Sequence, residues 1–142
     1  MLEEYRDKVY RCIRCGLCRA KYDYFDKIFR VCPVGEHSGG FESYFPRGRL
    51  AVALEILEGN LTYSDALAEV IYDCTLCANC REVCGAMDTT TAKPLIDTPA
   101  IVKAMRAGMF AAGIEIPDGV TRFGDAVEKT HNIFGAPSEE RN

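Results

Sequence analysis

The sequence has no tryptophan, only two histidines and no long apolar run. Its most apolar stretches, residues 50–57 and 107–116, contain Glu or Gly and fall short of the roughly 18 to 20 residues that cross a bilayer. The first eight residues, MLEEYRDK, lack the basic start and the apolar segment of a secretory signal. We therefore expect a soluble, cytoplasmic protein with no direct membrane insertion.

Blocks of like charge and recognisable catalytic groups are missing as well. The 17 Lys and Arg residues form no cluster and are outnumbered by 21 Asp and Glu residues, for a formal charge of −4. This balance argues against a nucleic-acid surface. We find no paired carboxylates, no nucleophile with a base and no glycine-rich phosphate loop. No catalytic residue and no small-molecule substrate of its own are therefore expected.

Strand-like alternation of apolar and polar residues is also absent, whereas helical periodicity recurs. The hydrophobic fraction of 48% is enough for a packed core. Ser64, Thr98 and Asp118 are the predicted N-caps of the last three helices. The predicted helices cover residues 50–57, 65–74, 98–112 and 118–134. The expected fold class is all-α, with a cluster-bearing domain over residues 1–92 and a helical extension with a charged tail, for partner docking, over residues 93–142.

Cysteine is the residue that the sequence has in excess, with eight in 142 residues. The pattern YxCxxCxxC occurs twice, at Tyr10–Cys18 and at Tyr72–Cys80, 62 positions apart. One later cysteine follows each triplet, Cys32 after the first and Cys84 after the second. This accounts for all eight thiols and leaves none for catalysis. In a reducing compartment such cysteines indicate metal ligands rather than disulfides.

Three cysteines spaced three apart let one short loop direct three thiolates at three corners of an iron–sulfur cube, while Gly16 permits tight wrapping. The loop cannot easily reach the fourth corner. In the ferredoxin run CxxCxxCxxxCP, the fourth cysteine ligates the other cluster. If the same crossed ligation applies to this chain, the sequence predicts two 4Fe-4S clusters. The first is held by Cys12, Cys15, Cys18 and Cys84, and the second by Cys74, Cys77, Cys80 and Cys32.

Crossed ligation would join the two halves of the chain through metal, so loss of the clusters should unfold the domain. The alternative is a pair of structural zinc sites with four cysteines each. Zinc sites usually assemble from two separated CxxC pairs, whereas triplets with a remote fourth cysteine fit cubane clusters better.

The order CxxCxxC, CP, PRGRL, CxxCxxCxxxC over residues 8–90 resembles the dicluster α-helical ferredoxin family. The chain is similar to the small electron-carrying subunit of heterodisulfide reductase. It is related to the N-terminal module of the fused heterodisulfide reductase subunits and to glycolate oxidase iron–sulfur subunits. PRGRL (Pro46–Leu50) and the C-terminal HNIFGAPSEER are the more discriminating segments. Two departures are Gly85, where many members have Pro, and a long gap between Cys18 and Cys32.

The resemblance implies an α-helical ferredoxin fold and an electron-transfer role in anaerobic metabolism. In fused members a segment similar to residues 132–141 leads into CCG domains. The resemblance therefore implies that these domains lie on a separate subunit, with a flavoprotein subunit as electron donor. Fully cysteine-ligated clusters leave no iron open to substrate, so catalysis would belong to these partners.

A regulatory iron–sulfur redox sensor is the alternative function. Against it, the sequence has no recognisable DNA-binding element and no spare thiol. Arg47 and Arg49 have two interpretations. They lie near a cluster and raise its potential, or they are helix-start arginines in surface ion pairs, which is the interpretation that we favour because such pairs are common.

Overall fold

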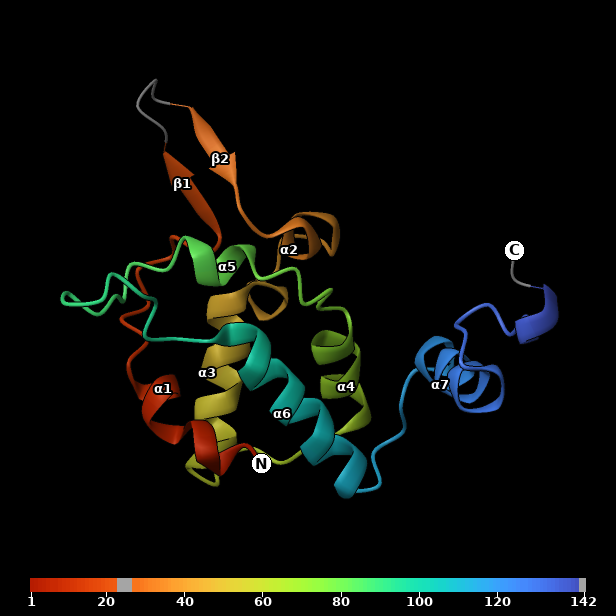
Figure 1. Ribbon diagram of the computed structural model, residues 1–142. Helices are drawn as coiled ribbons and strands as arrows, with labels where there is room; N and C mark the ends of the chain where they lie inside the picture. Colours follow the sequence, from red (N-terminus) through yellow and green to blue (C-terminus); the bar gives the residue numbers. More distant parts are fainter. Residues whose placement is uncertain (23–26, 141–142) are drawn as a thin grey trace.

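The computed structural model describes residues 1–22 and 27–140. Over these residues the chain forms short helices and one small sheet (Figure 1). In chain order the elements are the 3-10 helix η1 (Glu3–Tyr5), α1 (Arg6–Tyr10), β1 (Ala20–Tyr22), β2 (Ile28–Arg30), α2 (Pro33–His37), η2 (Glu42–Tyr44), α3 (Pro46–Leu57), α4 (Asp65–Tyr72), α5 (Asn79–Glu82), α6 (Thr98–Ala111), α7 (Asp118–Thr130) and η3 (Ser138–Glu140).

The hydrophobic core lies where α3 packs against α1 and α6, and where α6 packs against α4 (Figure 1). Helices α3, α4 and α6 each contribute one apolar stripe, as the periodicity predicted, whereas α1 was not predicted. The core includes Val9, Leu50, Ala53, Ile71, Ile101, Met105 and Met109, all buried. Helices this short are marginal in isolation, so their stability comes from this shared packing.

Side-chain caps fix where two of these helices begin. Ser64 caps α4 as predicted, since its Oγ accepts a hydrogen bond from the Leu67 amide at 3.3 Å. The predicted cap of α6 is wrong by one residue. Asp97, not Thr98, is the N-cap, and its Oδ1 accepts from the Ala100 amide at 3.2 Å. Thr98 is thereby the first residue of the helix, and its side chain is buried.

The prediction that the chain contains no sheet is wrong. Strands β1 and β2 pair antiparallel, with Ala20 opposite Arg30, and the hairpin projects from the helical body (Figure 1). It occupies the long gap between Cys18 and Cys32. All three residues of β2 are exposed. Because this strand buries no face against the core, its sequence carries none of the alternation from which strands are predicted.

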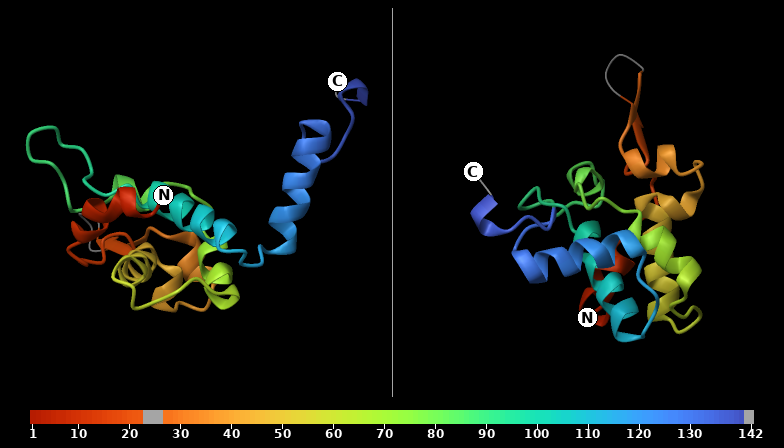
Figure 2. Two further views of the ribbon diagram at one scale, coloured as in Figure 1. Left: turned by 90° about the horizontal axis from the view of Figure 1, so that it is seen from below. Right: turned by 90° about the vertical axis from the view of Figure 1, so that its right-hand side faces the viewer.

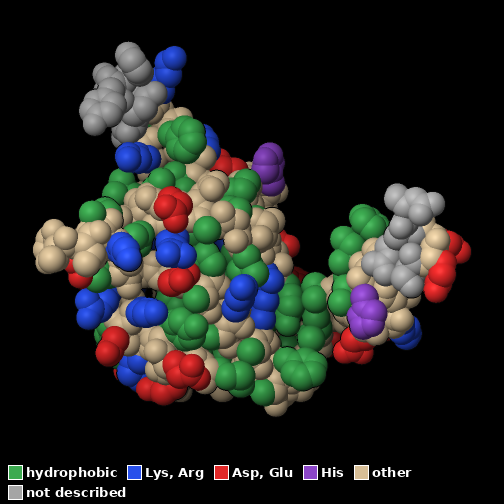
Figure 3. Space-filling model, viewed as in Figure 1, with side chains coloured by type: hydrophobic (Ala, Val, Ile, Leu, Met, Phe, Trp, Pro, Cys, Tyr) green, Lys and Arg blue, Asp and Glu red, His purple; other side chains and the backbone are tan. Residues whose placement is uncertain are grey.

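Helix α7 stands apart from the helical body (Figures 1 and 2). Its predicted capping by Asp118 is wrong, because Pro117 holds the N-cap position and no side chain caps the helix. The helix also ends earlier than predicted, at Thr130, where His131 adopts a left-handed conformation with φ of 53°. The apolar residues of its stripe, Val120, Phe123 and Val127, are exposed, and hydrophobic side chains are visible there in the space-filling view (Figure 3).

The division of the chain at residue 92 stays a prediction. The packing shows that α6, which follows this point, shares one core with α3 and α4. Within the described ranges, no helix combines the length and apolarity that crossing a membrane requires.

Candidate metal centre

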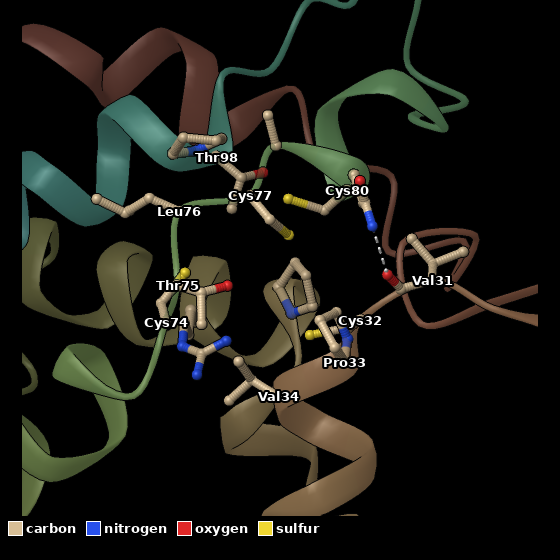
Figure 4. A pocket seen from close by; sticks show the side chains of 15 residues that line it. Val31, Cys32, Pro33, Val34, Cys74, Thr75, Leu76, Cys77, Cys80 and Thr98 are labelled. Atoms are coloured by element: carbon tan, nitrogen blue, oxygen red, sulfur yellow. Dashed lines mark hydrogen bonds between the residues drawn. The ribbon is translucent and has the colours of Figure 1, made fainter.

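The eight cysteines line two cavities, four at one and five at the other, because Cys80 belongs to both linings. Cys32, Cys74, Cys77 and Cys80 line one of them, the Cys32 cavity, where their side chains point into a common space (Figure 4). Cys12, Cys15, Cys18 and Cys84 line the other, the Cys12 cavity. Cys80 and Thr98 line both. The structure thus places each late cysteine beside the triplet of the other half of the chain.

The two cavities are alike in size and closely adjacent. Their volumes are about 390 and 370 Å³, including the space at each mouth that is open to solvent. The cavities adjoin because Cys80 and Thr98 form part of the wall of each. Two equivalent groups held here would therefore be neighbours.

The backbone of both triplets follows the same unusual path. Arg14 and Leu76 occupy equivalent positions and have φ of 55° and 56°. Gly16 and Ala78 are the next equivalent pair, with φ of 84° and 67°. A left-handed conformation costs a residue other than glycine about 1–2 kcal/mol. The duplication seen in the sequence is therefore also a duplication of loop shape, and strain of this kind is typical of ligand-holding loops.

This path leaves the loop amides free of other backbone partners. Among the described residues, no backbone carbonyl accepts a hydrogen bond from the amides of residues 13–18 or 75–80. Successive amides in alternating right-handed and left-handed conformations form concave anion-binding sites, including those of iron–sulfur clusters. Each loop thus offers a row of donors beside its three thiols.

The helices around the loops position the remaining thiols. Helix α4 leads directly to Cys74, and α5 contains Cys80 and ends two residues before Cys84. Cys32 is the N-cap of α2, where its Sγ accepts a hydrogen bond from the Gly35 amide at 3.5 Å. The Cys84 Sγ lies 3.8 Å from the carbonyl oxygen of Ala86.

Two longer helices begin at the cavities. Pro46 of α3 and Pro99 of α6 line the Cys32 cavity, while Leu50 of α3 lines the Cys12 cavity and Thr98 of α6 lines both. The N-terminus of a helix carries partial positive charge. Both helices therefore favour an anionic group between the thiols.

Arg47 combines the two interpretations that the sequence left open. Its Nε donates to Glu42 at 2.7 Å, which is an ion pair of partly exposed side chains, and this hydrogen bond lowers the pKa of Glu42. Its Nη1 donates to the Arg14 carbonyl at 3.3 Å, and the side chain lines the Cys12 cavity. The ion pair is present, and it lies at the metal loop.

The interpretation of Arg49 as a surface arginine is wrong. The residue is 1% exposed and lines the Cys32 cavity. Its Nε donates to the Val70 carbonyl at 3.1 Å and its Nη1 to the Tyr44 carbonyl. Its Nη2 is buried without a hydrogen-bond partner among the described residues. The cavity thus has a guanidinium in its wall.

Arg106 is a residue near the site that sequence analysis missed. It projects from α6 and donates to the carbonyls of Ile71, Tyr72 and Cys74, with its guanidinium 4.9 Å from the centre of the Tyr72 ring. These carbonyls end α4 and begin the second loop. The only sequence signal was a basic residue at the edge of an otherwise apolar stripe.

Burial favours the neutral form of several thiols. Burial, together with the charges of neighbouring thiolates, raises the pKa of Cys18 to about 11 and that of Cys80 to about 12. A hydrogen bond from the Thr98 hydroxyl partly offsets the rise at Cys80. Burial also raises the pKa of Cys84, as do Cys12 and Cys15. Iron binds the thiolate, so cluster binding must displace these protons.

No three His, Cys, Asp or Glu side chains in residues 1–22 and 27–140 are grouped as ligands of one metal ion. What the structure provides instead is two larger spaces, each with four thiols, free loop amides and helix N-termini.

The fold and these two cavities are typical of a protein that holds metal clusters through cysteine. Residues 8–86, more than half of the chain, match the family described as 4Fe-4S dicluster domain. The chain belongs to this family. It is also similar to the Uncharacterized electron transport protein YkgF of Escherichia coli (strain K12), with 35% identity over 86 residues that cover 59% of this chain and 15% of that protein. No solved structure matches the chain.

The residues at both cavities fit the group that the family name describes. A 4Fe-4S cluster takes four thiolates and carries net negative charge, which amides and cations stabilise. Each cavity has at least four cysteines, a row of free loop amides and an arginine in its wall. When bound, such a cluster accepts and releases single electrons.

Proposed function

We propose that this chain is an electron-carrying subunit that relays electrons through two 4Fe-4S clusters. Cys12, Cys15, Cys18 and Cys84 would hold one cluster, and Cys32, Cys74, Cys77 and Cys80 the other. The donor would be a flavin-containing subunit, and the acceptor a CCG-domain or similar subunit of a heterodisulfide reductase-like complex. Within this complex the chain has no catalytic site of its own.

The observation that carries this proposal is the pair of adjoining four-thiol cavities. Because Cys80 and Thr98 line both, electrons would cross only a thin wall of protein between them. The proposal also agrees with the name of the Escherichia coli relative, an electron transport protein.

The exposed thiols offer two separate sites at which partner proteins could exchange electrons with such a relay. Cys15 and Cys77, the middle cysteines of the two triplets, are exposed, whereas Cys18 and Cys80 are more enclosed. Each cavity therefore has one cysteine at the protein surface, and Cys80 lies between the two cavities because it lines both. A partner docked at Cys15 and another docked at Cys77 would each contact a different cluster.

Anaerobic purification followed by metal and sulfide analysis tests the proposal. We expect brown protein with about eight iron atoms and about eight acid-labile sulfides per chain, on the stoichiometry of two cubane clusters. Colourless protein that contains zinc and no sulfide would contradict it.

Redox titration in the presence of the co-purifying partner separates a relay from a sensor. A relay is reduced and reoxidised reversibly while its affinity for the partner stays constant. An affinity that switches with the redox state would instead favour the regulatory alternative. Chains that co-purify under anaerobic conditions would show whether the donor is a flavoprotein.

A further inference from the structure

The buried guanidinium of Arg49 has an unused hydrogen-bond donor at the Cys32 cavity. Its other two nitrogens are held by the carbonyls of Val70 and Tyr44, which fix the plane of the group. Nη2 is buried, and nothing in the described part of the chain accepts its hydrogens. Buried donors in native proteins are nearly always paired, so an orphaned one indicates a partner that is not protein.

The charge of Arg49 is also uncompensated. In the described ranges, no Asp or Glu forms an ion pair with it. Burying a charge without a counter-charge is strongly unfavourable. Helix α3 nevertheless places this residue in the core, facing the cavity wall formed with Cys32 and Cys74.

Arg106 is a second positive charge near Arg49. The pKa of Arg106 is lowered, mainly by burial and also by the positive charge of Arg49, while the Cys74 thiolate raises it. Arg106 does not line the cavity itself but hydrogen-bonds to the carbonyl of Cys74, which does. Two guanidinium groups therefore lie near Cys74, and an anion between the thiols would be attracted to both.

The equivalent arginine at the Cys12 cavity is different. The Arg47 side chain is 32% exposed, so water screens its charge, and Glu42 neutralises it at 2.7 Å. An exposed, paired cation stabilises a nearby anion much less than a buried, unpaired one does. The two cavities thus share their thiol pattern but differ in their electrostatics.

We propose that Arg49 donates its free Nη2 hydrogen bond to the cluster held by Cys32, Cys74, Cys77 and Cys80, and thereby makes it the more easily reduced of the two. This inference depends on the proposed function, because it requires both clusters. Reduction adds one electron to a cluster, and the buried positive charge stabilises the added negative charge. Electrons would then collect at the Cys77 end of the relay.

An EPR-monitored titration with dithionite tests the inference on Arg49→Met, with Arg49→Lys and Arg47→Met as matched variants. Iron and sulfide are measured first in the wild type, because their absence there would refute the proposed function and not the role of Arg49. Cys77→Ser identifies the signal of the Cys32-cavity cluster by altering only that signal.

The wild type should show this cluster reduced at the higher potential. Arg49→Met should lower the equilibrium constant for reduction of this cluster at least tenfold, which lowers its potential by 59 mV for a one-electron couple. The potential of the other cluster should stay unchanged. Arg49→Lys should retain most of the wild-type potential, and Arg47→Met should shift only the Cys12-cavity cluster. Unchanged potentials in an iron-replete Arg49→Met protein would overturn the inference.

A second measurement leaves Arg49 intact, in case Arg49→Met fails to fold. Protein carrying Arg47→Lys is prepared with arginine labelled with ¹⁵N in the guanidinium group, and reduced. Pulsed EPR should then detect a ¹⁵N coupling on the signal of the Cys32-cavity cluster. Absence of any arginine nitrogen coupling on that signal would overturn the proposed hydrogen bond.

Discussion

Gly48, in the PRGRL segment at the start of α3, has no room for a methyl group. A Cβ built on its backbone would lie 1.9 Å from the Glu42 carbonyl oxygen, 2.6 Å from the carbonyl carbon and 3.0 Å from the Ser43 Cα. All three are backbone atoms of η2 and cannot rotate away. Gly48→Ala therefore forces η2 and α3 apart, since ordinary contact begins at 3.4 Å.

That displacement would reach both arginines of the site. Arg47 pairs with Glu42, and Arg49 donates to the Tyr44 carbonyl, so each loses an anchor in η2. Overpacking costs about 1–3 kcal/mol, and a hydrogen bond to a charged group about 1.5–3 kcal/mol. Alanine recovers about 1 kcal/mol of helix propensity. The expected net loss is about 3 kcal/mol of unfolding free energy, or a fall of about 10 °C in Tm for a chain of this size.

Thermal unfolding of the anaerobically purified protein, followed by circular dichroism, measures this loss. Gly119→Ala in α7 is the matched control, because no atom lies within 4 Å of the position that its Cβ would take. The control should leave Tm within a few degrees of the wild type. A Gly48→Ala protein with wild-type Tm and full iron content would refute the close contact between η2 and α3.

Three further predictions concern the loops and their supports. Arg106→Met should lower the free energy of unfolding, measured with denaturant, by about 2–3 kcal/mol, because three carbonyls lose a charged donor. The control Arg122→Met in α7 should lower it little. Equal losses in the two variants would contradict the packing of α6. Ala78→Gly should raise stability by about 0.5–1 kcal/mol, because glycine relieves the left-handed strain at φ of 67°, and a destabilised variant would contradict this. The affinity of the apoprotein for iron during cluster reconstitution should rise between pH 6 and pH 8. Cys18 and Cys80, with pKa values of about 11 and 12, must lose protons to bind iron. An affinity independent of pH would contradict this.

The parts of the fold that the sequence predicted were those set by local chemistry. The Ser64 cap depends on one hydroxyl and the amide three residues away, so it was readable from the sequence. The apolar stripes that bury Leu50, Ile71 and Ile101 follow from helical periodicity. The pairing of each late cysteine with the opposite triplet stays a prediction, although both cavities have that lining.

The parts that the sequence did not predict depend on tertiary contacts. Arg49 is polar, and only the packing of α3 and α4 against η2 shows that it is buried. Leu76 and Ala78 adopt left-handed conformations, but neither is a glycine, so the sequence does not indicate them as it does Gly16. The β1–β2 hairpin was missed because β2 is wholly exposed and lacks a buried face.

Iron content across a set of cysteine variants tests crossed ligation most directly. Cys15→Ala and Cys84→Ala should each lose one cluster, and the double variant Cys15→Ala/Cys84→Ala should still retain about four iron atoms per chain, because both residues serve the same cluster. Cys77→Ala/Cys84→Ala should retain almost none. If the first double variant loses all its iron while the second keeps about four atoms, each triplet uses its own later cysteine and the crossed arrangement is contradicted.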